Sequence, residues 1–268
     1  MHGLGNDFLV LDMINQPLDM TTELVRRLAD RHTGIGCDQL LLIEAPTLPD
    51  ADFRYRIFNA DGQEVEHCGN GARCFAKYVV ENKLTGLTTI KLQTGEQIIT
   101  VSIVEGGVAV DMGQPNLEPS AVALDAERSD SLFEFKTKTS TLHFDVASMG
   151  NPHAVVNVED TDTAAVAEQG EELQASGLFA NGVNVGFMQV VERDRIKLRV
   201  FERGVGETRA CGTGACAAVA CGIRQGLLDS SVTVELPGGE LTINWPESDA
   251  SMTMTGPATK IFDGKMKL

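Results

Sequence analysis

A glycine-rich turn that carries a cysteine occurs twice in the chain, and this duplication constrains the fold more than any other feature. The first copy reads N-A-D-G-Q-E-V-E-H-C-G-N-G-A-R-C over residues 59–74, and the second reads E-R-G-V-G-E-T-R-A-C-G-T-G-A-C over residues 202–216. Each copy reaches its cysteine, Cys68 or Cys211, ten residues after the phenylalanine that ends an apolar, strand-like run. A helical pattern follows both cysteines. The sequence therefore predicts two halves of similar structure.

Other segments repeat at nearly the same spacing. Residues 4–11, L-G-N-D-F-L-V-L, resemble residues 149–156, M-G-N-P-H-A-V-V. Residues 33–44, T-G-I-G-C-D-Q-L-L-L-I-E, resemble residues 180–192, A-N-G-V-N-V-G-F-M-Q-V-V-E. A repeat of this length is the size of a domain and too long for a solenoid. We predict an α+β fold of two pseudo-symmetric domains, each a mostly antiparallel sheet or barrel around one buried central helix. The first domain would comprise residues 1–112 and a C-terminal return, 257–268, and the second residues 113–256.

Apolar periodicity and turn residues predict the individual elements. Helices are expected over residues 20–32, with Thr21 or Thr22 as the cap, and over 162–178. The helix after Cys211 is apolar nearly all round, which predicts that it is buried inside its domain. Strands are expected over 88–112 with a turn at 105–107, in a hairpin over 232–245, and in a closing strand over 251–262.

The two cysteines have a physical reading as reactive groups. A thiol at a helix start feels the positive end of the helix dipole, which lowers its pKa and favours thiolate. Gly69 and Gly71, like Gly212 and Gly214, would let the backbone approach a ligand closely. The alternative is that both cysteines are buried core thiols. Two cysteines at matching places in matching turns favour the functional reading.

Composition narrows the class of protein and of partner. Of the 268 residues 43% are hydrophobic and 22% charged, which is typical of a soluble globular protein. The formal charge of −16 argues against a nucleic-acid or anionic-membrane partner. Six cysteines without a signal peptide indicate reduced thiols in the cytoplasm. The cysteines include no C-x-x-C pair, and although His67 adjoins Cys68 we expect no metal site.

We expect the two similar domains to face each other across a cleft and to bring both helix starts, and so both cysteines, together there. Two facing thiols could form a disulfide, bind a metal, or act as two bases on opposite faces of one carbon. The third use explains the pseudo-symmetry best. Moving a proton across a stereocentre needs one base to remove it and one acid to return it from the other side, and the reverse reaction exchanges these roles.

At these motifs the chain closely resembles the diaminopimelate epimerases, cofactor-independent amino-acid epimerases of bacterial lysine and peptidoglycan synthesis. The shared motifs include H-G-L-G-N-D-F, C-G-N-G-A-R-C, G-N-P-H and E-R-G-V-G-E-T-R-A-C-G-T-G-A, in order over nearly the whole chain. The resemblance implies interconversion of LL- and meso-diaminopimelate by a homodimer, with no cofactor and no metal. It implies that Cys68 and Cys211 are the acid/base thiols, with His153 and Glu202 beside them. Substrate contacts would come from Asn6, Gln39, Asn59, Gly69, Asn70, Asn151, Asn184, Glu202, Arg203, Gly212 and Thr213.

Two departures from the family pattern and two rival functions accompany this resemblance. Family members usually have a few residues of strand before M-H-G-L-G, and a tyrosine near the dimer interface where this chain has Phe262.

One rival is a proline or hydroxyproline racemase of the same fold; Arg203 and the several asparagines favour a substrate charged at both ends instead. The other rival is a non-catalytic redox sensor that uses the paired thiols as a reversible disulfide.

Overall fold

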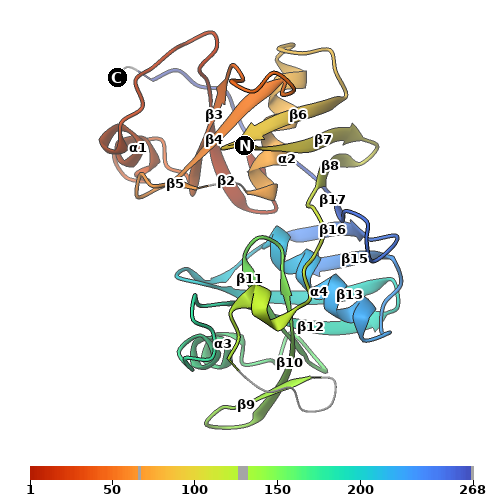
Figure 1. Ribbon diagram of the computed structural model, residues 1–268. Helices are drawn as coiled ribbons and strands as arrows, with labels where there is room; N and C mark the ends of the chain where they lie inside the picture. The colour runs from red at the N-terminus through yellow and green to blue at the C-terminus, as the bar shows by residue number, and fades with distance from the viewer. Residues whose placement is uncertain (66–67, 126–131, 267–268) are drawn as a thin grey trace. The chain divides into compact units, whose positions relative to one another are not determined.

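The computed structural model describes residues 1–65, 68–125 and 132–266, which form two compact units (Figure 1). The first unit is Met1–Asp111 with Thr255–Leu268, and the second is Met112–Met254. The chain thus leaves the first unit one residue before the boundary expected from the sequence and returns to it two residues before. Each unit is described by itself below.

The first unit is a mostly antiparallel sheet built around the second of its two helices. The order along the sheet is β1, β2, β3, β4, β6, β7, β8, with β5 paired on β4. Of these pairs, β2–β3 and β4–β6 are parallel and the others antiparallel. The bounds are β1 His2–Gly3, β2 Asn6–Asp12, α1 Thr22–Ala29, β3 Gln39–Glu44, β4 Phe53–Asn59, β5 Glu64–Val65, α2 Gly69–Glu81, β6 Thr89–Thr94, β7 Gln97–Val104 and β8 Gly107–Asp111.

The second unit repeats the pairing of β1 to β7 in its strands β10 to β16, and adds β9, which pairs with β10. Here β11 and β12 are parallel, β12 and β13 antiparallel, β14 pairs with β13, and β15 lies parallel to β13 and antiparallel to β16. The bounds are η1 Pro119–Val122, β9 Phe133–Lys136, β10 Thr141–Ser148, β11 Pro152–Asn157, α3 Val166–Gln174, β12 Asn184–Glu192, β13 Arg195–Glu202, β14 Gly206–Thr208, α4 Gly212–Arg224, β15 Ser231–Leu236, β16 Gly239–Asn244 and β17 Thr253–Gly256. The predicted α+β fold of two pseudo-symmetric halves is confirmed.

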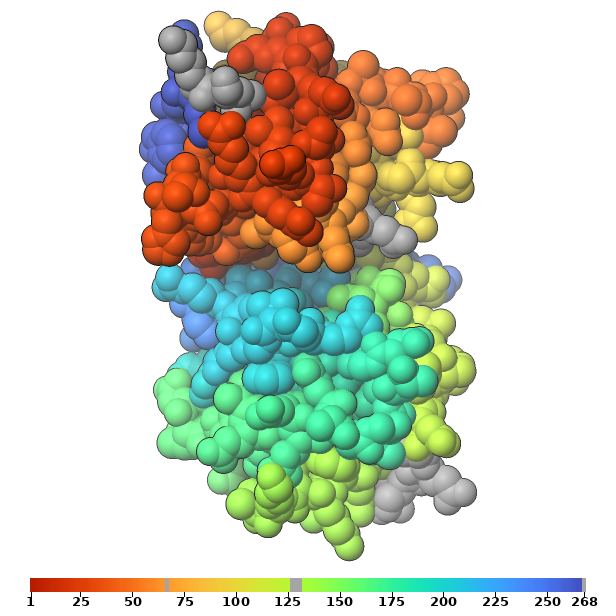
Figure 2. Space-filling model, turned by 90° about the vertical axis from the view of Figure 1, so that its left-hand side faces the viewer, coloured from red at the N-terminus to blue at the C-terminus, as the bar shows by residue number. Residues whose placement is uncertain are grey.

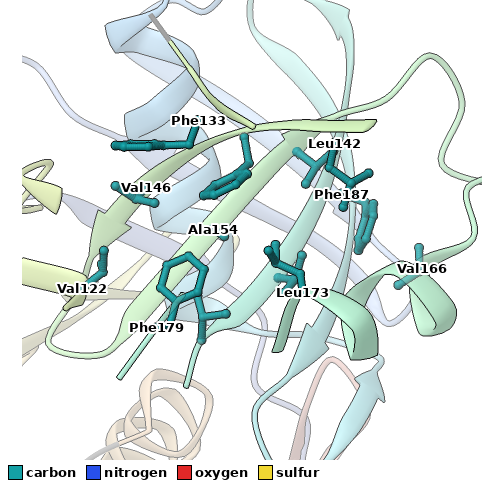
Figure 3. Close-up of a cluster of buried hydrophobic side chains, with 13 residues drawn as sticks. Val122, Phe133, Leu142, Val146, Ala154, Val166, Leu173, Phe179 and Phe187 are labelled. Atoms are coloured by element: carbon teal, nitrogen blue, oxygen red, sulfur yellow. The ribbon is translucent and has the colours of Figure 1, made fainter. Parts of the chain in front are cut away.

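The core of each unit has a helix on either side of one central strand. In the first unit Leu40 and Leu42 of β3 pack against α1, while Leu41 lies on the opposite side, toward Gly71 of α2. Alternate side chains of a strand point to opposite faces, so a strand covered on both faces is a continuous apolar run. In the second unit Val185 and Phe187 of β12 join the cluster that packs against α3 (Figure 3).

The helices α2 and α4 are enclosed by the strands of their own units (Figure 1). The residues of α4 from Ala215 to Gly222 are all buried, which confirms the prediction from its apolar composition. Thr21 caps α1 as expected, its hydroxyl accepting a hydrogen bond from the amide of Leu24.

Three predicted elements differ in extent from those observed. Helix α1 ends at Ala29 rather than at residue 32, because the Asp30 carboxylate accepts hydrogen bonds from the amides of His32 and Thr33 and draws the chain into a turn. Helix α3 begins four residues later than expected, and the closing strand β17 has only four residues.

Strand β17 pairs with β8, and the segment after it is bound to the first unit by hydrogen bonds from both side chains and backbone. Arg73 and Lys77 of α2 donate hydrogen bonds to the carbonyls of Pro257 and Ala258. His2 and Thr259 exchange backbone hydrogen bonds at 2.8 and 2.9 Å. Figure 2 shows this segment, in dark blue, beside the red and orange N-terminal residues. Side chains of α2 therefore bind the C-terminal segment, and the sequence of that segment does not predict these contacts.

Each cysteine turn also contains a short strand that was not predicted. In the first turn β5 pairs antiparallel with β4, and in the second turn β14 pairs antiparallel with β13. These strands have two and three residues, too few for an alternating pattern to be visible.

A substitution at Gly71 tests the packing of α2. A Cβ added at Gly71 would overlap the Tyr55 hydroxyl, which donates a 3.1 Å hydrogen bond to the Cys68 carbonyl. We expect Gly71→Ala to lower the free energy of unfolding by about 1–3 kcal/mol in urea denaturation, since overpacking a core is destabilising. Gly86→Ala, where a Cβ meets nothing within 4 Å, is the matched control. Equal effects of the two substitutions would contradict the prediction.

Candidate active site

Both cysteines cap the enclosed helices of their units. Cys68 is the residue before α2 and Cys211 the residue before α4, each with extended backbone angles. Their carbonyls accept the first helical hydrogen bonds, from Ala72 at 2.9 Å and from Ala215 at 3.0 Å. Their side chains make no capping hydrogen bond, so the thiols are not consumed in closing the helices. The predicted location of both cysteines at helix starts is confirmed.

Amide side chains surround the Cys68 thiol. The thiol donates to Oδ1 of Asn6 at 3.7 Å, and Nδ2 of Asn70 donates to the same oxygen at 3.5 Å. Gly69 and Asn70, the first two residues of α2, are buried. Three of the predicted residues near Cys68 therefore form one connected group with it.

Gln39 and Asn59 form a second amide pair in the first unit. They lie opposite each other on β3 and β4, and Nε2 of Gln39 donates to Oδ1 of Asn59 at 2.8 Å. This bond uses one N–H of Gln39 and one lone pair of the Asn59 oxygen, so both amide side chains have capacity for further hydrogen bonds.

A corresponding chain of hydrogen bonds reaches Cys211 in the second unit. The Cys211 thiol lies 3.6 Å from the Thr213 hydroxyl, to which Nδ2 of Asn151 donates at 3.3 Å. Oδ1 of Asn151 lies 3.0 Å from Nε2 of His153. Because an amide oxygen only accepts, Nε2 of His153 carries the proton of this bond.

Asn184, Glu202 and Arg203 complete the second group. Asn184 is buried, donates to the Pro152 carbonyl at 3.2 Å and accepts the Arg203 amide at 2.9 Å. The Glu202 carboxylate accepts hydrogen bonds from the Thr208 hydroxyl and from Cys211. The Arg203 guanidinium binds the Asn181 carbonyl and remains exposed.

The two groups correspond residue by residue through the strand pairing. Gln39 pairs with Phe8 between β3 and β2, as Asn184 pairs with His153 between β12 and β11. The buried His153 thus occupies the place of a phenylalanine in the first unit. By the same correspondence the amide of Asn59 is replaced by the carboxylate of Glu202. The scaffold is duplicated, but the polar chemistry of the two copies differs.

Burial controls the electrostatics of the Cys211 group. The pKa of Cys211 is raised well above its usual value, first by burial and then by the negative charge of Glu202; Thr213 and the Gly214 amide oppose this rise only in part. The pKa of Glu202 is also raised by burial. The expectation that the helix dipole lowers the pKa of this thiol is wrong, because the cost of a buried charge exceeds the stabilisation by a helix end.

The glycines of the turns have a different use from the one expected at two positions. A Cβ at Gly71 would overlap the Tyr55 hydroxyl, so the packing of the unit by itself requires a glycine there. A Cβ at Gly214 would lie 3.1 Å from a methyl group of Val200 and 3.2 Å from the sulfur of Cys211. These glycines let each helix approach the strands of its own unit closely.

Sequence reasoning missed a charged cluster that holds Asn6. Arg31 donates to both oxygens of Asp7, at 2.7 and 2.8 Å, and to Asp38 at 2.8 Å. The other oxygen of Asp38 accepts Nδ2 of Asn6 at 3.1 Å, which directs Oδ1 of Asn6 toward Cys68. Asp38 lies beside Gln39 in the repeated segment, so its place in the repeat was the available signal.

The described residues add two observations about metals and membranes. Within residues 1–65, 68–125 and 132–266, no group of three or more His, Cys, Asp or Glu side chains is arranged to hold a metal ion. His67 lies outside the described residues. No helix in the described part of the chain has the length and apolar character needed to cross a membrane.

A family model described as diaminopimelate epimerase matches residues 1–118 and 146–261. A diaminopimelate epimerase from Azotobacter vinelandii is 50% identical over 269 aligned residues, which cover 100% of this chain and 98% of the relative. The chain belongs to the diaminopimelate epimerase family. This confirms the family and the class of enzyme, an isomerase, that the motifs indicated.

Solved structures with the family's fold are more distant in sequence. A hydroxyproline epimerase from Agrobacterium vitis has a TM-score of 0.66 at 17% identity, covering 96% of this chain and 87% of that one. A probable proline racemase from Agrobacterium radiobacter has the same TM-score and identity, with 98% and 92% covered. At this identity the similarity shows a shared fold and nothing about substrate.

The buried His153 makes a testable contribution to stability. Burial, and then the charge of Arg203, lower its pKa from 6.5 to about 3. Between these values the unfolded chain binds a proton at His153 that the folded chain does not, so acidification favours unfolding. We expect the free energy of unfolding to fall, relative to His153→Gln, by about 1.4 kcal/mol per pH unit between pH 6 and 4. Urea denaturation at several pH values measures this, and parallel curves for the two proteins would contradict it.

Proposed function

We propose that this chain interconverts LL-2,6-diaminopimelate and meso-diaminopimelate by a two-base mechanism in which Cys68 and Cys211 are the acid/base groups. The observation that supports this most strongly is the placement of the two thiols, each capping an enclosed helix within a corresponding group of polar side chains. Neither pyridoxal phosphate nor a metal ion takes part in the proposed reaction.

The proposed chemistry moves one proton out and one proton in. A thiolate removes the proton from the α-carbon, and negative charge develops on the adjoining carboxylate. Backbone amides at the helix starts, at Gly69 and Asn70 and at Gly212 and Thr213, bind that carboxylate and stabilise the charge. The second thiol then donates its proton to the opposite face of the carbon, becomes a thiolate, and inverts the centre. The reaction requires both thiols to reach one carbon, and the proposal includes this requirement.

The raised pKa of Cys211 suits a proton donor. With Glu202 ionised beside it, Cys211 keeps its proton at neutral pH until the carbanionic carbon can accept it. When the reaction runs in the other direction, Cys211 must lose its proton to act as the base. In our proposal Cys211 acts on the LL isomer and Cys68 on the meso isomer, as in the family pattern.

The remaining polar residues are proposed to orient the groups that react. His153 stays neutral and holds Asn151, which in turn contacts Thr213 next to Cys211. Diaminopimelate carries a second amino-acid group at its far end, and a cation and several amides can bind it. We assign this role to the exposed guanidinium of Arg203 and to Asn6, Gln39, Asn59 and Asn184.

We also propose that the enzyme is a cytoplasmic homodimer with no nucleic-acid or membrane partner. The formal charge of −16 supports the exclusion of anionic partners. Near the C-terminus Ile261 and Phe262 expose 60% and 66% of their surface, which supports an apolar contact with a second copy.

A single assay tests the activity. The protein is incubated with LL-diaminopimelate in deuterated water under reducing conditions and followed by NMR. We expect the α-proton signal to disappear as meso product forms, with the same rate after dialysis against a chelator. L-Proline and trans-4-hydroxy-L-proline are the comparison substrates. Exchange only with the cyclic substrates would favour the racemase alternative, and exchange with none would favour the redox-sensor alternative.

The two-base assignment predicts that each thiol serves one face of the substrate. Cys68→Ser and Cys211→Ser should each abolish epimerisation, since a hydroxyl is a far weaker acid than a thiol. A substrate with a leaving group on the carbon next to the acidic centre needs only one deprotonation for irreversible elimination. We expect Cys68→Ser to eliminate from one stereoisomer and Cys211→Ser from the other, measured by release of the leaving group. Equal elimination from both stereoisomers by either variant would refute the assignment.

A further inference from the structure

Arg73 is a fully buried cation one turn into α2, and the reaction proposed above does not use it. Its exposed fraction is 0%, although arginine is almost never fully buried unless it is paired. Burying a charge in this way is costly unless its hydrogen bonds are satisfied. The contacts of Arg73 therefore indicate what the residue is for.

The guanidinium of Arg73 connects the Cys68 turn with the end of the chain. Nε donates to the Pro257 carbonyl at 3.1 Å, and Nη2 donates to Oδ1 of Asn70 at 2.9 Å. A Cβ at Gly3 would lie 3.0 Å from Nη2, so the absence of a side chain there leaves room for the guanidinium. One buried side chain thus contacts the helix start, the N-terminal strand and the returning segment.

These contacts fix the orientation of two amides next to Cys68. Because Arg73 only donates, Asn70 must present its Oδ1 to Arg73 and its Nδ2 to Asn6. Asp38 only accepts when ionised, so Asn6 presents its Nδ2 to Asp38 and its Oδ1 to Asn70 and Cys68. If Asn70 rotated its amide, two oxygens would face each other. Arg73 and Asp38 therefore hold the two amides from opposite sides.

The second unit has no such cation at the corresponding position. Counting five residues from each cysteine, Arg73 corresponds to Cys216, which is buried and uncharged. The charged group next to Cys211 is instead the carboxylate of Glu202, whose own counterpart in the first unit is the neutral Asn59. A cation thus lies behind the Cys68 group and an anion beside Cys211.

We propose that Arg73 is a positioning residue for Cys68, acting through Asn70 and through its positive charge. It holds the amides of Asn70 and Asn6 in the orientation that the thiol requires. Its charge favours the thiolate of Cys68, the form that removes a proton. The catalytic consequence rests on the proposed epimerase function, but the effect on the thiol itself does not.

The test compares the reactivity of two cysteines within one protein. Arg73→Met removes the charge and the donors, Arg73→Lys keeps the charge, and Arg56→Met on β4, an arginine paired with Glu44 and Glu64, is the control. Each protein is treated with iodoacetamide without substrate, and mass spectrometry follows the alkylation rates of Cys68 and Cys211 separately. The melting temperature is measured in parallel.

We expect Arg73→Met to slow alkylation of Cys68 about tenfold, since loss of a nearby opposite charge raises a thiol pKa by one unit or more and only thiolate reacts. Alkylation of Cys211 should change less than about twofold. Arg73→Lys should restore much of the Cys68 rate, and Arg56→Met should leave the ratio of the two rates unaltered. A purely structural role predicts the opposite sign, because loosening the unit exposes the half-buried thiol and speeds its alkylation. A faster or unchanged Cys68 rate in Arg73→Met would overturn the proposal.

If Arg73→Met does not fold, Arg73→Gln keeps most of the volume and a donor to Asn70 while removing the charge, and the same slower Cys68 rate is expected. In the epimerase assay both uncharged variants should lower kcat with little change in KM. Altered alkylation without any epimerase activity in the wild type would sink the proposed function and leave the role of Arg73 standing. Epimerase activity in the wild type, together with an unaltered ratio of the two alkylation rates in Arg73→Met, would support the proposed function and overturn the role of Arg73.

Discussion

Each unit of the structure depends on the enclosure of one helix within a sheet. The residue that precedes each enclosed helix is a cysteine. A helix surrounded by strands buries most of its circumference, which favours small or apolar residues, and α4 consists largely of alanine, cysteine, glycine and valine. Its first amides have no partner within the helix. Such a helix start is a favourable place for an anion, and in both units a cysteine, Cys68 or Cys211, stands there. The same packing therefore places a thiol at the start of each enclosed helix, where the proposed reaction needs an acid/base group and a site for a carboxylate.

Duplication of this unit supplies two such helix starts, and divergence between the copies gives them different chemistry. Strands β1 to β7 and β10 to β16 pair in the same way, so corresponding side chains occupy corresponding positions. Exchanges that alter the polar groups include Asn59 for Glu202, Phe8 for His153, and Arg73 for Cys216. A reaction with two bases needs one thiol and one thiolate at the same moment, which two identical environments would not favour. The cation bound to Asn70 in the first unit and the carboxylate beside Cys211 in the second fit that requirement of the proposed reaction.

The polar groups near the thiols lie mostly within the core, and this determines their behaviour. His153 and Asn184 are buried with their hydrogen bonds made by neighbours in the same unit. A buried polar network keeps its geometry because each lost partner leaves an unsatisfied group. It also shifts titration, so that His153 stays neutral and Cys211 keeps its proton. The groups are thus oriented before any substrate is bound.

The sequence by itself determined the duplication, the α+β class, the helices after Cys68 and Cys211, and the family, because each depends on local patterns or ordered motifs. Only the tertiary structure decided the pKa of Cys211, since burial outweighs the local helix dipole. It also decided the roles of Gly71 and Asp38 and the return of the chain to α2 through Arg73. Residues 73 and 257, or 6 and 38, meet through packing over long sequence separations, and no periodicity or spacing in one sequence records which distant atoms will come into contact.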